Sequence, residues 1–187
     1  MSVENLVFFL EEISAREMLK IIVPKIIPET VTPFYFSFEG KQDLEKNIAK
    51  KMKNWLLPNT AFIIMRDKDS EDCLKLKERL VNLCLESGKA KESFLVRIAC
   101  PELESFYLGD IDAVKNAGFR GTIPSKRKGK FNTPDLLNGF DELHSLTNGT
   151  YQKVQGSKAI APFLSLDGSN KSTSFNMLIS GIRKIIN

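Results

Sequence analysis

Residues 61–72 join an apolar run to closely spaced carboxylates. Five apolar residues are followed by Arg66-Asp67-Lys68-Asp69-Ser70-Glu71-Asp72. Such a run is typical of a strand buried on both faces of a parallel sheet, and open α/β sheets bind ligands at the carboxyl ends of their strands. In an extended backbone Asp67 and Asp69 share a face, where two hard oxygen ligands would suit Mg²⁺ or Mn²⁺. A solvated turn followed by a helix cap is the alternative interpretation.

Two other acidic pairs follow apolar runs in the same way. Glu11 and Glu12 come directly after residues 5–10, and Glu102 and Glu104 come shortly after residues 94–99. A parallel sheet gathers the carboxyl ends of its strands at one edge. The sequence therefore predicts that carboxylates from three strand ends meet there.

The elements that must position these acids alternate between strand and helix patterns. Expected strands are residues 5–10, 34–38, 61–65 and 94–99, and expected helices are residues 14–26, 43–57, 71–87, 102–108 and 110–117. Ser14 and Glu17 have the spacing of a capping box at the first helix. The alternation predicts an α/β fold with a parallel four-stranded sheet flanked by helices and right-handed crossovers.

The character of the chain changes after Gly118. Residues 119–134 are rich in Gly and Pro and predict a long loop, which contains the basic residues Lys126, Arg127, Lys128 and Lys130. These cations could follow nucleic-acid phosphates or could form a solvated loop. Ser157 could cap a short helix, and residues 175–186 carry one apolar stripe. We expect residues 1–118 to form the α/β domain and residues 119–187 a mainly helical extension packed on it.

Composition excludes several classes of protein. The chain has 187 residues, 42% of them hydrophobic, with a formal net charge of +4, which fits a globular domain. It has no apolar stretch of membrane-spanning length, no signal-peptide pattern and no P-loop spacing. The three cysteines form no CxxC motif and indicate reduced thiols in a cytoplasmic protein. His144 is expected at the surface, so no catalytic triad can be assembled.

The acidic motifs resemble those of the Toprim domain, the catalytic fold of topoisomerases, primases and OLD-family nucleases. That family has a Glu after its first strand, matched by Glu11, and an Asp-x-Asp after its third, matched by Asp67 and Asp69. The chain is still more similar to a bacterial Toprim-like family of unknown function, in the segments at residues 9–12, 38–45, 66–73, 97–105 and 151–162. Because many Toprim domains have Gly where this chain has Glu12, the choice between Glu11 and Glu12 stays open.

The resemblance implies a metal-dependent nuclease or nickase. Glu11, Asp67 and Asp69, with Glu102 and Glu104, would hold Mg²⁺ or Mn²⁺ against a phosphodiester of DNA or RNA, and Lys153 or Lys158 would neutralise the developing charge. It also implies an ATPase partner encoded nearby and a role as effector of an anti-phage defence system. The alternatives are a non-catalytic partner that binds an ATPase or nucleic acid, and a phosphotransfer enzyme acting on small nucleotides.

Overall fold

Four parallel strands form the centre of the molecule. The computed structural model describes residues 3–121 and 129–187. The strands are β1 (Asn5–Leu10), β2 (Thr32–Ser37), β3 (Thr60–Asp67) and β4 (Phe94–Ala99), in the order β2-β1-β3-β4. Every neighbouring pair is parallel, so the predicted four-stranded parallel sheet flanked by helices is confirmed.

Helices connect the strands and continue beyond them. The α-helices are α1 (Ile13–Ile22), α2 (Lys41–Lys53), α3 (Cys73–Leu85), α4 (Glu104–Leu108), α5 (Ile111–Asn116), α6 (Gly139–Leu146), α7 (Lys153–Ile160) and α8 (Thr173–Ile186). Short 3₁₀ turns occur at Val23–Lys25, Lys91–Ser93, Gly129–Asn132, Pro134–Leu136 and Ala161–Phe163. None of the helices in residues 3–121 and 129–187 is long and apolar enough to span a membrane.

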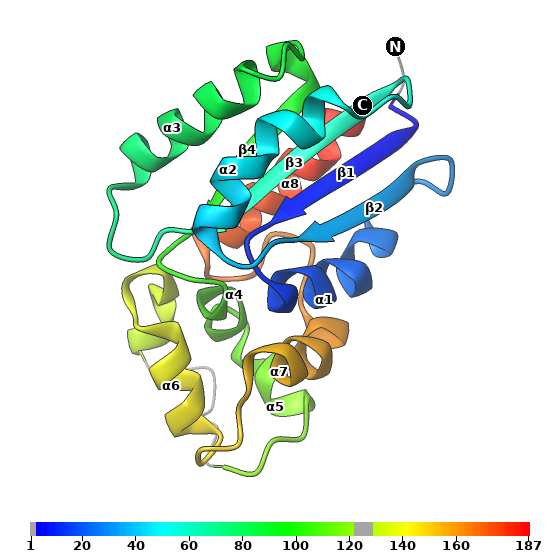
Figure 1. Cartoon of the computed structure of the whole chain (residues 1–187). Helices are drawn as coiled ribbons and strands as arrows, with labels where there is room; N and C mark the ends of the chain where they lie inside the picture. Colours follow the sequence, from blue (N-terminus) through cyan, green and yellow to red (C-terminus); the bar gives the residue numbers. More distant parts are fainter. Residues whose placement is uncertain (1–2, 122–128) are drawn as a thin grey trace.

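Each face of the sheet packs against its own layer of helices. Alternate residues of β1 point to opposite faces: Leu6, Phe8 and Leu10 join the core with α1 and α8, whereas Val7 and Phe9 join the core with α2 and α3. Figure 1 shows α2 and α3 on one side of the sheet and α1 and α8 on the other. Burial on both faces explains why β1 and β3 are almost continuously apolar.

The helices α4–α7 lie beyond the carboxyl ends of the strands (Figure 1). Their apolar side chains belong to the same core as α1 and α8, with Tyr107, Tyr151 and Ile160 fully or almost fully buried in it. α8 then returns to the sheet beside β4, where Arg97 Nε donates to the Met177 carbonyl at 2.9 Å. The carboxyl edge of the sheet is therefore enclosed between the strands and a group of helices.

Several local expectations are corrected. Ser14 lies inside α1 and its hydroxyl donates to Glu12 Oε1 at 2.6 Å, so the predicted capping box is wrong. α3 begins at Cys73 with Asp72 as its N-cap, and α7 begins at Lys153 and not at Ser157. β3 continues to Asp67, two residues past the expected end. Pairing with β4 carries the strand through Arg66 and Asp67, although both side chains are charged.

Candidate metal centre

The ends of β1 and β3 place two sequence-predicted acids next to each other. Leu10 pairs with Met65 in the parallel register, and the Glu11 amide continues the ladder by donating to the Met65 carbonyl at 3.2 Å. Glu11 Oε2 in turn accepts a hydrogen bond from the Asp67 amide at 3.0 Å. Hydrogen bonding therefore holds Glu11 against the last residue of β3.

Asp67 is a nearly buried carboxylate surrounded by other acids. Its exposure is 8%. Burial raises the pKa of Asp67 well above its ordinary value, and the charges of Glu12, Glu104 and Glu11 raise it further. Burial also raises the pKa of Glu11, against the lowering effect of its bond to the Asp67 amide. Burial and like charge therefore favour the protonated forms of Asp67 and Glu11.

Glu104, in the first turn of α4, is a fully buried acid. Its Oε1 accepts a hydrogen bond from the Tyr151 hydroxyl at 3.0 Å, while its Oε2 has no hydrogen-bond partner among the described residues. Burial raises the pKa of Glu104 to about 7. Tyr151 is held by close packing on Gly156, where an added Cβ would lie 2.1 Å from the ring. The sequence therefore needs glycine at this point of α7.

Lys153 is the cation of this group. Its Nζ lies 3.4 Å from both carboxylate oxygens of Glu12. Burial alone would lower the pKa of Lys153, but the charges of Glu104, Glu12 and Asp67 together raise it. We call Glu11, Glu12, Asp67, Glu104 and Lys153 the Asp67 cluster. Among the described residues of this cluster, Lys153 is the one cation beside four carboxylates, and Arg66 Nε also reaches Glu11 Oε2 at 3.7 Å from the other face of β3.

A second charged group surrounds Arg66, on the other face of β3. The Arg66 side chain is 0% exposed and pairs with Glu45 and Glu71. Arg79 binds the same two acids, at 3.1 Å and 2.5 Å, and Lys41 binds Asp69 at 3.0 Å. We call Arg66, Arg79, Lys41, Glu45, Asp69 and Glu71 the Arg66 cluster. Among the described residues, this cluster contains three cations and three carboxylates, and it is linked to the Asp67 cluster because Arg66 Nε lies 3.7 Å from Glu11 Oε2.

The expectation that Asp67 and Asp69 share one face is wrong. The backbone leaves the extended conformation after β3, and Asp69 has a φ of 52°. Its carboxylate lies 3.0 Å from Lys41 Nζ and 3.8 Å from Arg66 Nη2. The Asp-x-Asp motif is thus divided between the two clusters, although the charge of Asp69 still raises the pKa of Glu11 to a lesser degree than burial does.

The remaining candidates have other partners. Glu102 Oε1 accepts from the Phe140 amide at 2.8 Å, at the start of α6. Lys158 Nζ lies 3.5 Å from Glu17, so it pairs outside the Asp67 cluster. Lys130 pairs with Glu142 at 2.6 Å. The basic residues Lys126, Arg127 and Lys128 lie outside the described residues.

The donor set of the Asp67 cluster fits a hard divalent cation by its chemistry. Carboxylate oxygens are preferred by Mg²⁺ and Mn²⁺, and no residue in the described part of the chain hydrogen-bonds to the buried Glu104 Oε2. Within the part of the chain that the structure describes, no three His, Cys, Asp or Glu side chains are arranged to hold a metal ion together. The metal-ligand set stays a prediction.

The sequence motifs do not mark two residues of the site, Arg66 and Tyr151. An arginine within a buried strand needs carboxylate partners, which Arg66 finds in Glu45 and Glu71. Nothing local in the sequence shows that the Tyr151 hydroxyl reaches Glu104. Charge inside an apolar strand was the available signal for Arg66. For Tyr151, no pattern in the sequence gave its partner.

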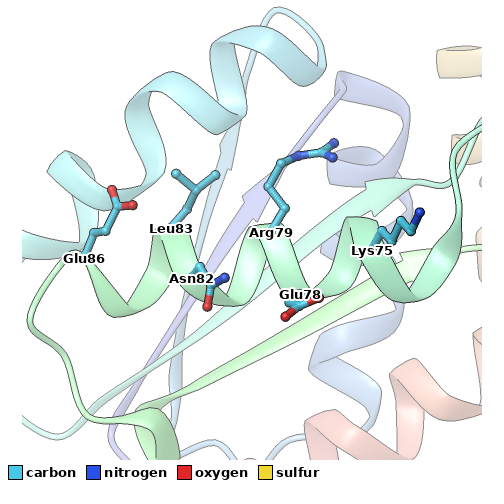
Figure 2. Close-up of a pocket in the computed structure, with 6 residues that line it drawn as sticks. All are labelled: Lys75, Glu78, Arg79, Asn82, Leu83 and Glu86. Carbon is cyan, nitrogen blue, oxygen red and sulfur yellow. The ribbon is translucent and has the colours of Figure 1, made fainter.

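A hollow elsewhere on the surface is a weaker candidate. Figure 2 shows a pocket of about 280 Å³ along α3, lined by Lys75, Glu78, Arg79, Asn82, Leu83 and Glu86. Five of these residues belong to α3 and Glu86 directly follows it, and together they mix both signs of charge. Lys75 and Arg79 balance Glu78 and Glu86, so the pocket gathers no excess of one charge. Only Arg79 belongs to either cluster. The carboxyl edge of the sheet remains the better candidate site.

Comparison with known proteins places this chain in a family. A family model described as a domain of unknown function (DUF4276) matches residues 10–183, so the chain belongs to that family. The structure is similar to that of the C-terminal region of the Burkholderia pseudomallei OLD protein, with a TM-score of 0.55 and 17% identity over 97% of this chain and 98% of the other. At this identity the likeness shows the fold. No curated protein matches the chain.

Proposed function

We propose that this DUF4276 protein cleaves phosphodiester bonds of DNA or RNA with Mg²⁺ or Mn²⁺ held at the Asp67 cluster. One observation carries the proposal: at the carboxyl edge of the sheet the buried Asp67 lies against Glu11, its amide donating to Glu11 Oε2 at 3.0 Å, while Glu104 is fully buried nearby. Lys153 Nζ lies 3.4 Å from the neighbouring Glu12. Burying like charges together is costly unless a cation compensates them. The Toprim resemblance of the sequence and the OLD-like fold support the same reaction.

Each residue of the cluster would have a definite task. Asp67, Glu11 and Glu104 would hold the cation, which would stabilise the attacking and leaving oxygens of the phosphodiester. Lys153 would neutralise charge that develops on the phosphate. Lys158 is the less favoured lysine because it pairs with Glu17. Asp69 and Glu102 are less favoured ligands because one oxygen of each is already held, by Lys41 and by the Phe140 amide.

The protons of the metal-free cluster are part of this proposal. A carboxylate must be deprotonated to bind a cation, so binding displaces protons. Burial raises the pKa of Glu104 to about 7, so protons and the cation compete for this carboxylate near neutral pH. The affinity for Mn²⁺ should therefore rise as the pH increases through 7.

Cleavage assays would test the proposal directly. Wild-type protein and the Asp67→Asn variant would be incubated with Mn²⁺ and end-labelled single- and double-stranded DNA and RNA, alone and with any ATPase encoded nearby. We expect Asp67→Asn to lower the rate at least about a hundredfold, since each tenfold corresponds to about 1.36 kcal/mol of barrier. Lys153→Ala should also lower it, whereas Lys158→Ala serves as the matched control.

The outcomes separate the proposal from its alternative. Equal rates for Asp67→Asn and wild type would exclude this site as the catalytic centre. The non-catalytic alternative has support of its own, because Glu102 and Glu104 both make structural hydrogen bonds. A wild-type protein that neither cleaves nucleic acid nor gains thermal stability with millimolar Mn²⁺ would favour that alternative.

A further inference from the structure

Two cysteines that are distant in sequence bring their sulfurs together beside the carboxyl edge. Cys73 is the first residue of α3 and Cys100 directly follows β4. Their Sγ atoms lie 3.8 Å apart, across 27 residues of sequence. Both side chains are half-buried, whereas the third cysteine, Cys84, is buried in the core under α3. All three are free thiols.

The backbone around the pair is already held in place. The Lys68 amide donates to the Ala99 carbonyl at 2.9 Å, and the Asp69 amide donates to the Pro101 carbonyl at 2.9 Å. Asp72 caps α3 by accepting from the Leu74 and Lys75 amides. A disulfide has an S–S distance of about 2.05 Å, so the sulfurs need to approach by about 1.8 Å.

We propose that Cys73 and Cys100 form a modification site, a dithiol that small-molecule disulfides convert into an intramolecular disulfide. One cysteine thiolate attacks a sulfur of the small disulfide, forms a mixed disulfide and releases one small thiolate. The second cysteine then attacks the protein sulfur of that mixed disulfide and releases the other. The two protein thiols lose two protons and two electrons, and the small disulfide becomes two small thiols.

The bond would connect two segments that carry candidate ligands. Cys73 directly follows the loop that contains Asp69, and Cys100 begins the segment that contains Glu102 and Glu104. Oxidation would restrain the separation of these segments. Disulfides in reducing compartments are usually transient and regulatory, and this position next to the acidic edge suits such a use. The chemistry of the pair does not depend on whether the edge is catalytic.

Oxidation of the full chain with oxidised glutathione tests the proposal. After the reaction, free thiols would be alkylated, and the products would be identified by intact mass and peptide mapping. We expect wild type to lose two hydrogen atoms and to yield a linked peptide containing Cys73 and Cys100. The Cys84→Ser variant is the matched control and should form the same link.

Single-cysteine variants complete the test. Cys73→Ser and Cys100→Ser should lose the link, and in each of them the remaining cysteine should stop at the thiol or the glutathione adduct. Melting curves of both variants would show that they fold. In wild type, amide exchange in residues 68–72 should slow by about tenfold on oxidation. Persistent free thiols or glutathione adducts in wild type, or unchanged exchange in the linked protein, would overturn the proposal.

Discussion

The Asp67 and Arg66 clusters contain the same kinds of side chain and lie on opposite faces of the end of β3. Successive residues of a strand point to opposite faces, so Arg66 pairs with Glu45 from α2, which also binds Arg79 from α3. Asp67 instead faces the side of α1, α4 and α7, and its pKa responds to Glu12 and Glu104. One cluster is balanced in charge and the other is not, among the described residues.

This difference separates two uses of acidic residues at one sheet edge. Hydrogen bonds to Arg79 and then Arg66 lower the pKa of Glu71, so the Arg66 cluster stabilises its charges without any further ion. Burial and like charge raise the pKa values of Asp67 and Glu104. An excess of buried negative charge, and not the number of acids, therefore marks the place where a cation would bind.

Removing Arg66 should have the largest effect on stability. Arg66→Met would leave Glu45 and Glu71 with Arg79 alone, and removing one partner of a buried ion pair costs about 3–5 kcal/mol. Arg79→Met is the matched control, because Arg79 is 43% exposed and exposed pairs contribute about 1 kcal/mol or less. Urea unfolding of both variants measures the difference. Equal losses would show that the Arg66 cluster is not a buried structural unit.

Neutralising Glu104 should remove a loss of folding stability that wild type shows as the pH rises. The pKa of Glu104 rises from 4.5 to about 7 on folding. Its contribution to stability is fully present below pH 4.5 and is lost as the pH rises to 7, which amounts to about 3 kcal/mol. Glu104→Gln should therefore be more stable than wild type at pH 8, with less gain at pH 5, by urea unfolding.

Glu71→Gln is the opposing control from the Arg66 cluster. The pKa of Glu71 is lowered in the folded state. Its contribution is present above its unfolded pKa and is lost as the pH falls through the folded value. This variant should lose stability at neutral pH and converge with wild type in acid. The same sign for both variants would remove the distinction between the clusters.

Divalent cations should stabilise the protein through the Asp67 cluster. A cation at a hundred times its dissociation constant contributes about 2.7 kcal/mol. Melting curves with Mn²⁺ or Mg²⁺ against EDTA would show the shift in wild type, and Glu104→Gln or Asp67→Asn should reduce it. Glu71→Gln should keep it. A shift lost only in Glu71→Gln would assign the cation to the other cluster.

The smallest effect is expected from Lys158. Its side chain is 55% exposed and pairs with Glu17, so Lys158→Ala should change stability by less than about 1 kcal/mol. Lys153→Ala should behave differently, because it removes the cation nearest to Glu12 and leaves the excess negative charge larger. That variant should gain more stability from Mn²⁺ than Lys158→Ala does. Identical responses would make the two lysines equivalent.

The strands and the position of the acids could be predicted from the sequence. Long apolar runs broken by polar segments define buried strands, and β1, β3 and β4 lie at or near the expected residues. Acids after those strands had to reach one edge of a parallel sheet. Errors arose at element boundaries, such as the start of α7, because a short amphipathic pattern does not define where its first turn begins.

Which acids share an environment was decided only by the tertiary structure. Sequence alone determined that carboxylates from three strand ends gather at the sheet edge, but Asp69 turned to Lys41 because its φ is positive. Burial raises the pKa of Glu104, whereas Lys153 and Tyr151, which follow it by more than 40 residues, lower it in part. A carboxylate's charge state depends on the solvent and the charges around it, and those are properties of packing and not of local sequence.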